Sequence, residues 1–571
     1  MNDLTRRVLR GLQYLTLKTR LARFAAQLQN PAAAQAERRR DILSANANSE
    51  FGRQHHFAAI TNADEYRRAV PVRRYADFMP LIERLKNGEK NVLTAEPVSM
   101  FGITSGTESV AKFIPLTRRF TREHHYMHLM WLWSMIAARP LGIVGDIFSV
   151  ISPAVGGYVG GIPYGAISGK HYRDQSLPQR RLNCVPYAVC LVKDSLRRNY
   201  LSLLYALAAD IRCANSANPS TLILLAQILN DYAEPLLDDL AAGGLRGLDF
   251  SDEERRQFAR PPAAARARIL RERFRADKVL LPRTAWENLC AINTWQGGCA
   301  PFYLPRVRET WGAAPMRCWG LRATEGIFSV PTADDAKSAG GAVAIGGHFL
   351  EFTADLETFT EFPATVLAHE LEIGKRYRLI ITTSGGLYRY DLGDVVEVTG
   401  FNRRTPEIAF LYKAGGVVSV TGEKVTPEQV VATLATVGRN FPPLTDFTVG
   451  VEMCSPPRYV VAIEPRNGEP DNGDARFDRL ARAFDEELAR RNVEYRDKRA
   501  GGRLDAPTVS ILPAGSYQIY REHRVRSGSP DGQIKPPQLL RPEAWRDFRR
   551  IIAAGGNCKN PESAYKRAIT N

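Results

Sequence analysis

Helical and strand-like hydrophobic patterns alternate along this chain, and the alternation limits the folds that it can adopt. Apolar residues recur at helical spacing over four long stretches: residues 1–60, 193–214, 219–242 and 262–275. From residue 285 the pattern changes to short strands and turns. Within Tyr377–Phe401, residues alternate between two faces, and a Gly393-Asp394 turn is predicted between strands at Leu387–Tyr390 and Val395–Val398. Helices and strands mixed in this way favour an α/β fold.

The last 160 or so residues are predicted to form a smaller α+β unit. Thr426 can cap a helix that starts at Pro427, and Gln429 can complete a capping box. Two strands and a helix are predicted after it: Asp446–Met453, Tyr459–Glu464 and residues 475–491. We place the domain boundary near residues 405–415, which gives an N-terminal domain of residues 1–410 and a C-terminal domain of residues 411–571.

Charge and cysteine content narrow the class of protein. The 571 residues carry a formal net charge of +16. That excess fits a nucleic-acid binder or a protein that attracts anionic substrates such as ATP, and the spread of the charge over many segments favours the second. The eight cysteines form no CxxC pair, so a reduced, cytoplasmic setting is expected. No apolar stretch is long enough to suggest a transmembrane helix.

Residues 4–28 form a basic amphipathic pattern with a single acidic residue, Asp3, just before them. Such a segment could be a transit peptide, a membrane-surface helix or a helix packed on the main domain. We take packing on the main domain as the default interpretation.

A loop rich in hydroxyl groups and glycine is the first candidate site. Thr104–Ser109 and the nearby Lys112 could surround phosphate oxygens, because Gly106 allows the backbone to approach closely. The spacing is not that of a Walker loop, and a Ser/Thr/Gly run by itself is more often an ordinary loop.

Four later segments carry weaker signals of the same kind. Gly297–Pro301 is a glycine turn after a strand, and Thr324 with Glu325 could hold Mg²⁺ jointly with phosphates. An Asp within Leu387–Asp394 could bind ribose hydroxyls, and Lys535 before two prolines could reach a carboxylate–phosphate centre as a point charge. Each of these segments could equally be a surface turn or a solvated side chain.

Taken in order, these segments resemble the Gretchen Hagen family of acyl acid-amido synthetases, within the adenylate-forming superfamily of acyl-CoA synthetases, peptide-synthetase adenylation domains and luciferases. The resemblance covers most of the chain. The segments that carry it are Asp41–Arg53, Thr104–Pro115, Gly297–Pro301, Ala323–Glu325, Tyr388–Asp394 with Val398–Phe401, Ser419–Glu428 and Gly515–Pro536. It implies a large adenylate-forming domain, with mixed sheets and a β-barrel-like part flanked by helices, and a small, mobile α+β domain.

The resemblance also implies roles for individual residues. Thr104, Ser105, Gly106 and Thr107 would hold the ATP phosphates, and Gly298 would belong to the same nucleotide site. Thr324 and Glu325 would lie at the α-phosphate and Mg²⁺, with Glu325 the metal ligand. Asp394 would bind the ribose, Lys424 would act near the hinge and the nucleotide, and Lys535 would bridge the substrate carboxylate and the α-phosphate. Four positions depart from the family pattern: Glu108, Arg322, Asp391 and Gln538.

The activity that the resemblance implies is formation of an acyl-adenylate from ATP and a carboxylic acid. Transfer to an amine, expected to be an amino acid, would then release AMP, and the enzyme would act as a monomer without nucleic acid or an integral membrane. An acyl-CoA ligase using the same adenylate is the nearest alternative. A basic nucleic-acid or membrane-surface protein with a decayed site is the alternative of another class.

One further pattern lies in the apolar helical stretch Glu123–Ile136. His124 and His128 share a helix face at the spacing of a metal pair, although no third ligand is evident. Met127–Trp133 and the glycine-rich Gly156–Gly169 are expected to line the acyl pocket, as the resemblance implies.

Overall fold

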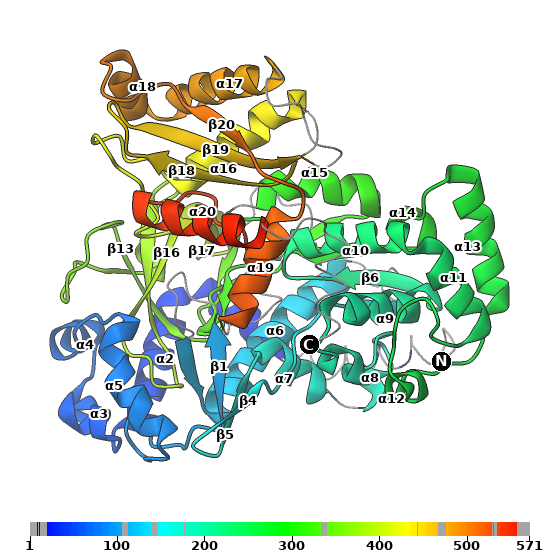
Figure 1. Cartoon of the computed structure of the whole chain (residues 1–571). Coiled ribbons are helices and arrows are strands. Elements are labelled where there is room, and N and C mark those ends of the chain that lie inside the picture. The colour runs from blue at the N-terminus through cyan, green and yellow to red at the C-terminus, as the bar shows by residue number, and fades with distance from the viewer. Residues whose placement is uncertain are drawn as a thin grey trace. The chain divides into compact units, whose positions relative to one another are not determined.

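The computed structural model divides into two compact units, the first ending at Phe410 and the second starting at Leu411. It describes most of the chain: residues 8, 11, 20–104, 112–138, 145–175, 177–298, 300–332, 340–441, 444–465, 475–527, 529 and 534–556. Figure 1 shows its helices and strands. No helix in these ranges is long and apolar enough to span a membrane.

Short helices open the first unit. They are α2 (Pro31–Asn46), α3 (Glu50–Gln54), η1 (Phe57–Ala59), α4 (Ala63–Ala69) and α5 (Tyr75–Lys86). Residues 20–29 are also helical, and Phe24 and Leu28 are buried in the core of this unit. The interpretation of a helix packed on the main domain is therefore confirmed for the described residues 20–29. Asn30 accepts a bond from Ala33 N at 3.3 Å and so caps α2.

A seven-stranded sheet forms one core of this unit, in the order β11-β12-β17-β16-β15-β13-β14. Its strands are β11 (Ser329–Val330), β12 (Gly341–Val343), β13 (Phe349–Thr353), β14 (Val366–Leu367), β15 (Arg376–Thr382), β16 (Tyr390–Asn402) and β17 (Thr405–Lys413). The short helix η3 (Ala368–Glu370) follows β14. The side chain of Gln35 links α2 to this sheet. It donates hydrogen bonds to Ile345 O and His348 O and accepts one from Leu350 N.

The predicted turn at Gly393-Asp394 is wrong. The chain reverses direction earlier, where Thr383 N bonds Leu387 O at 2.8 Å, and β16 then runs unbroken through Gly393 and Asp394. Arg378 pairs with Val395 and Ile380 pairs with Asp391, so three residues of β16 lie opposite one residue of β15. Residues 392–394 are therefore a β-bulge. The backbone of the bulge requires a positive φ at Gly393, which is 74°.

A second sheet has the order β2-β1-β5-β4. Its strands are β1 (Met100–Thr104), β2 (Lys112–Leu116), β4 (Gly157–Val159) and β5 (Ile162–Gly165). Only the β1–β5 pair is parallel. Helix α6 (Arg118–Ala138) follows β2 and α7 (Ile167–Arg173) follows β5. The glycine-rich segment Gly156–Gly169 thus forms strands β4 and β5 with a tight turn between them, and then the start of α7.

A third sheet is wholly parallel, in the order β3-β6-β7-β8. Its strands are β3 (Asp146–Ser149), β6 (Ile211–Asn215), β7 (Ala291–Thr294) and β8 (Met316–Cys318). Helices α9 and α10 lie below and above β6 in the view of Figure 1. The helices of this part are α8 (Leu177–Arg180), η2 (Tyr187–Leu191), α9 (Ser195–Leu207), α10 (Pro219–Asp231), α11 (Ala233–Ala242), α12 (Asp252–Gln257), α13 (Ala264–Asp277), α14 (Pro282–Ala285) and α15 (Ala300–Trp311).

Two helix predictions need correction here, and one helix was not predicted. The stretch 193–214 contains helix α9 and then strand β6, because a buried parallel strand has the same continuous apolar character as a buried helix. The stretch 219–242 is two helices, α10 and α11, separated at Tyr232. Helix α15 lies in the region predicted to contain only strands and turns, and it accommodates Pro305.

The second unit is a three-stranded sheet with helices. Strands β18 (Leu444–Glu452) and β19 (Arg458–Pro465) are antiparallel, and β20 (Thr508–Ile511) is parallel to β19. The helices are α16 (Pro427–Val437), η4 (Gly438–Asn440), α17 (Ala475–Arg491), α18 (Val493–Ala500), α19 (Ser516–Arg526) and α20 (Pro542–Gly556). The predicted capping box is confirmed, since Gln429 N bonds Thr426 Oγ1 at 3.2 Å and Thr426 N bonds Gln429 Oε1 at 3.0 Å.

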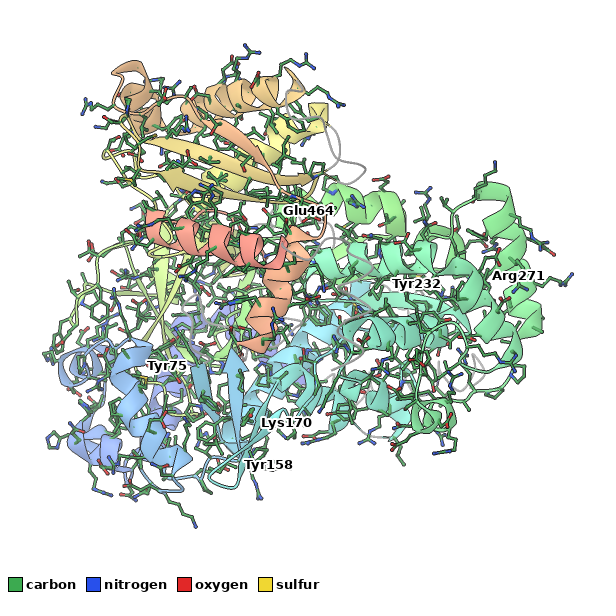
Figure 2. The ribbon with its side chains drawn as sticks, viewed as in Figure 1. Tyr75, Tyr158, Lys170, Tyr232, Arg271 and Glu464 are labelled. Atoms are coloured by element: carbon green, nitrogen blue, oxygen red, sulfur yellow. The ribbon has the colours of Figure 1, made fainter. Side chains whose placement is uncertain are left out.

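A buried carboxylate fixes one of these helices to the sheet of the second unit. Glu464 of β19, labelled in Figure 2, accepts from Gly515 N and Tyr517 N, both at 2.9 Å. These donors lie at the start of α19, where backbone N–H groups would otherwise lack partners. Glu464 therefore orients α19, the last helix before the segment that contains Lys535.

Candidate active site

The predicted site residues fall in both units. Gly298, Thr324, Glu325 and Asp394 belong to the first, and Lys424 and Lys535 belong to the second. Thr104 is the last residue of β1. Ser105, Gly106 and Thr107, like Glu108 and Ser109, lie outside the described residues.

Thr324 and Glu325 form the turn of a two-stranded hairpin, β9 (Arg322–Ala323) and β10 (Gly326–Ile327). Thr324 Oγ1 lies 3.4 Å from Ile103 O, so this turn packs against the end of β1. A Cβ atom at Gly102 would collide with Thr324 Cγ2. Glycine at position 102 therefore permits the contact that brings the turn beside the start of the predicted phosphate loop.

A buried tyrosine connects Glu325 with Asp394. Burial raises the pKa of Tyr390 well above its ordinary value, and the carboxylates of Glu325, Asp391 and Asp394 raise it further. Glu325 and Asp394 are themselves buried, at 6% and 4% exposed. Glu325, from the β9–β10 turn, and Asp394, from β16, therefore both lie within electrostatic range of the Tyr390 hydroxyl.

The two aspartates of the β16 bulge have different environments. Asp391 Oδ1 lies 3.5 Å from the buried Arg378 Nε and accepts a bond from Gly393 N at 3.0 Å. Its charge is therefore balanced within the sheet, which explains how an acidic residue is tolerated where the family pattern has a basic one. Asp394 lies at the end of the bulge, where the positive φ of Gly393 redirects the chain.

Sequence reasoning missed Tyr75 of α5, which is labelled in Figure 2. Its hydroxyl accepts a bond from Phe113 N at 2.7 Å, and the Lys112 ammonium lies 5.3 Å from its ring centre. Burial raises the pKa of Tyr75, with a contribution from Glu325. Tyr75 therefore ties α5 to the strand that directly follows the predicted phosphate loop. Only a tertiary contact reveals this role, so no local pattern could have indicated it.

Gly298 lies in the turn between β7 and α15, with a φ of 61° that glycine adopts readily. This turn follows the carboxyl end of a parallel strand, the edge at which open α/β sheets bind ligands. Polar side chains line the same edge, since Asn293 Nδ2 donates to Asn215 Oδ1 at 2.7 Å and Asn215 Nδ2 donates to Ser149 Oγ at 3.1 Å.

In the second unit, Lys424 projects from a loop that hydrogen bonds of the neighbouring Glu423 hold. It is exposed and has a φ of 49°. The neighbouring Glu423 carboxylate accepts from Val420 N at 2.9 Å and from the Tyr459 hydroxyl at 2.6 Å. Asn492 Nδ2 donates to the Glu423 carbonyl at 2.9 Å. These bonds fix the backbone from which the Lys424 side chain extends.

Lys535 is exposed and lies between α19 and a short segment that pairs with β18. That segment is held by two bonds to Val449, because Val449 N bonds Gln538 O at 2.9 Å and Leu540 N bonds Val449 O at 2.8 Å. Gln538, one of the departures from the family pattern, therefore contributes its backbone to the sheet.

The metal-pair interpretation of His124 and His128 is not supported. His124 Nδ1 lies 2.7 Å from His171 Nε2, and His128 Nδ1 lies 3.1 Å from Arg322 Nη1. No group of three or more His, Cys, Asp or Glu side chains among the described residues could hold a metal ion. A single buried carboxylate such as Glu325 does fit Mg²⁺, which binds proteins through one or two carboxylates together with phosphate oxygens.

Comparison with known proteins places this chain by sequence and by fold. Three sequence models match: the GH3 family N-terminal domain over residues 20–316, the central domain over 341–413 and the C-terminal domain over 427–544. One relative is the probable indole-3-acetic acid-amido synthetase GH3.2 of Oryza sativa subsp. japonica, which is 23% identical, with 87% of this chain and 86% of the relative covered. Another is indole-3-acetic acid-amido synthetase GH3.3 of Arabidopsis thaliana, 22% identical over 88% of each chain.

Solved structures agree in fold. The GH3.15 acyl acid amido synthetase has a TM-score of 0.79 at 21% identity, with 95% of each chain covered. A 2-hydroxyisobutyryl-CoA ligase in the postadenylation state has a TM-score of 0.52 at 13% identity, with 93% of this chain and 94% of the ligase covered. The fold is thus that of the adenylate-forming ligases. Within this class, the chain belongs to the GH3 family.

Proposed function

We propose that this protein uses ATP to convert a carboxylic acid to an acyl-adenylate and then transfers the acyl group to an amine, giving an amide, AMP and pyrophosphate. The observation that carries the proposal is the packing of the Thr324–Glu325 turn on the end of β1, with the buried carboxylates of Glu325 and Asp394 both within electrostatic range of Tyr390. Its relatives are named as amido synthetases, which supports an amide product, and we propose an amino acid as the acceptor.

The charges explain why such a site needs these residues. A carboxylate and the α-phosphate of ATP are both anionic, so attack requires positive charge and oriented donors. We assign Thr104, Ser105, Gly106, Thr107 and Gly298 to the nucleotide phosphates. Mg²⁺, when bound at the Glu325 carboxylate, would offset the negative charge of the phosphates.

The remaining residues would orient the nucleotide and balance the charges of the reacting groups. Asp394 would accept hydrogen bonds from the ribose hydroxyls, and the Thr324 hydroxyl would donate a hydrogen bond to an oxygen of the α-phosphate. Lys535 would supply an ammonium between the attacking carboxylate and the α-phosphate. Because Lys424 and Lys535 belong to the second unit, we propose that residues 411–571 act as a mobile domain that delivers Lys535 and then withdraws, so that the amine can enter.

The setting of the enzyme is part of the proposal. The six described free cysteines support a reduced, cytoplasmic environment. We propose that the protein acts as a monomer on small molecules, with ATP and Mg²⁺ and without nucleic acid.

A second candidate is an acyl-CoA ligase, in which a thiol takes the acyl group from the same adenylate. The fold shared with a CoA ligase at a TM-score of 0.52 favours keeping it. Incubation of the protein with ATP, Mg²⁺ and an acid panel, with either mixed amino acids or coenzyme A, separates the two by mass spectrometry. Amide products are expected, whereas thioester products alone would replace the proposal by the second candidate.

Lys535→Ala is expected to lower the rate of adenylation by at least 100-fold while ATP binding persists, because the ammonium acts on the reacting charges rather than on the nucleotide base. Carboxylate-dependent ATP–pyrophosphate exchange measures the rate, and calorimetry measures ATP binding. Arg479→Ala, which removes an exposed cation from α17, is the matched control and should leave both unchanged. Exchange retained at the level of the control would remove the role of Lys535.

A further inference from the structure

Arg322, the first residue of β9, extends its side chain to helix α6. Its guanidinium carbon lies 5.1 Å from the ring centres of both Trp131 and Trp319, which stack on each other at 4.1 Å. Arg322 Nε donates to Trp319 O at 2.6 Å, and Nη1 lies 3.1 Å from His128 Nδ1. The guanidinium is therefore held in one orientation by an aromatic surface and two polar contacts.

No acidic side chain among the described residues balances this cation. Burial lowers the pKa of Arg322 to about 9, and among the described residues the Cys318 thiol opposes the effect. Arg322 Nη2 is covered by protein and has no hydrogen-bond acceptor within the described ranges. A buried charge without a counter-charge is costly, so proteins rarely retain one for stability alone.

The histidines around Arg322 add polarity without negative charge. Burial lowers the pKa of His128 well below its ordinary value, and Arg322 lowers it further. Burial likewise lowers the pKa of His171 to about 3, with a smaller contribution from Arg322. Both imidazoles are therefore neutral at physiological pH. The region holds one fixed positive charge, neutral hydrogen-bonding rings and aromatic walls.

This region is close to the proposed adenylation site and partly open to solvent. The residues Arg322, His128 and Trp319 are each half-buried, but Nη2 of the guanidinium is covered, so a ligand that pairs with Nη2 has to displace the side chains that cover it. Arg322 precedes Glu325 by three residues, so their Cα atoms are at most about 10 Å apart. An acyl acid of ordinary size can span that distance.

We propose that Arg322 binds a second acidic group of the acyl acid, so that the preferred substrates are acids with two acidic groups. The carboxylate that reacts loses its charge on adenylation, whereas a second one keeps its charge through the reaction and can pair with the fixed guanidinium at every step. Trp131 and Trp319 orient the guanidinium from one side, and His128 offers a hydrogen bond to the same ligand group. The inference rests on the proposed adenylating function and names its substrate class.

The test compares matched acids in ATP–pyrophosphate exchange with the full chain: benzoate with benzene-1,3-dicarboxylate, and hexanoate with hexanedioate. The wild type is expected to show at least a tenfold higher kcat/KM for the diacid of each pair. Arg322→Met should abolish that preference while the monoacid rates persist, and Arg322→Lys should retain part of it. Arg268→Met, which removes an exposed cation from α13, should leave the preference unchanged.

Two results would overturn the inference. One is a wild type that favours the monoacids, and the other is a folded Arg322→Met that loses activity equally on both members of each pair. If Arg322→Met does not fold, the wild-type preference and the Arg322→Lys variant decide the question. Exchange with no acid of a broad panel would remove the proposed function as well, so the two failures are distinguishable.

Discussion

Two arginines of the first unit show how a structural cation differs from one reserved for a ligand. Arg389 is fully buried in the seven-stranded sheet, where its Nε lies 3.0 Å from Glu351 Oε2 and its Nη1 donates to two backbone carbonyls. Arg322 lies beside α6 and has no carboxylate partner among the described residues. In both arginines, Nη2 has no hydrogen-bond acceptor among the described residues. The two therefore differ in whether a carboxylate, here that of Glu351, pairs with the guanidinium.

The comparison teaches that burial alone does not identify a functional cation. Arg389 adopts a φ of 45°, which an L-residue rarely does, and the Glu351 pair and the carbonyl bonds hold it there. Its charge is balanced by the Glu351 carboxylate and by backbone carbonyls within the fold. The charge of Arg322 is not, so substitution should affect stability at one position and specificity at the other.

The largest expected effect is on Arg389. Arg389→Met should lower the free energy of unfolding by about 3 kcal/mol, because Glu351 loses its main partner in a buried environment. Arg67 Nε lies 3.3 Å from Glu351 Oε1 and remains as a weaker partner, which limits the loss. Urea unfolding followed by tryptophan fluorescence measures the change, and six of the seven tryptophans lie in the first unit: Trp131, Trp133, Trp286, Trp295, Trp311 and Trp319. A loss below 1 kcal/mol would contradict the structural role.

A smaller effect concerns His348, which lies in the same unit and has no hydrogen-bond partner for either ring nitrogen among the described residues. Burial lowers the pKa of His348 to about 4, below its value of roughly 6.5 in the unfolded chain. The unfolded state then binds more protons below pH 6.5, so stability falls as the pH falls towards 4. At pH 5 this residue alone should cost about 2 kcal/mol relative to pH 7.

The pH dependence can be measured by unfolding the wild type and His348→Gln at pH 7 and pH 5. The variant should lose about 2 kcal/mol less than the wild type between the two values. The exposed His369→Gln serves as the control and should follow the wild type. Equal slopes for wild type and His348→Gln would show that His348 is not held neutral by the fold.

The smallest effect is expected for the stability of Arg322→Met. Because no carboxylate is left behind, the free energy of unfolding should change by less than about 1 kcal/mol, or rise. The urea experiment used for Arg389→Met gives a direct comparison. A loss of 3 kcal/mol would mean that Arg322 is as structural as Arg389, and the distinction between the two regions would fail.

Local signals were enough to predict part of the fold. The capping box at Thr426 and the helix at residues 475–491 were both predicted, because each depends on neighbours in sequence. Most of strand β6, residues 211–214, was predicted as helix, since a buried parallel strand carries no alternation that distinguishes it. The bulge at Gly393 was predicted as a turn, because the Gly-Asp pair that it contains is also a common turn sequence.

In the candidate site, too, some features could be predicted from the local sequence and others could not. Glu325 and Asp394 could be named from short motifs, but their common neighbour Tyr390 was identified only once β9, β10 and β16 were positioned. Arg322 was recognised as a departure from the family pattern. Its contact with His128 joins residues 194 positions apart, which no local pattern can predict.

Carboxylate-dependent ATP–pyrophosphate exchange tests the central claim most directly. The purified chain, with Mg²⁺, labelled pyrophosphate and a broad panel of acids, should incorporate label into ATP only when a suitable acid is present, and Glu325→Gln should lower the rate by at least 100-fold. No incorporation with any acid, in protein shown to be folded and to bind ATP, would contradict the account.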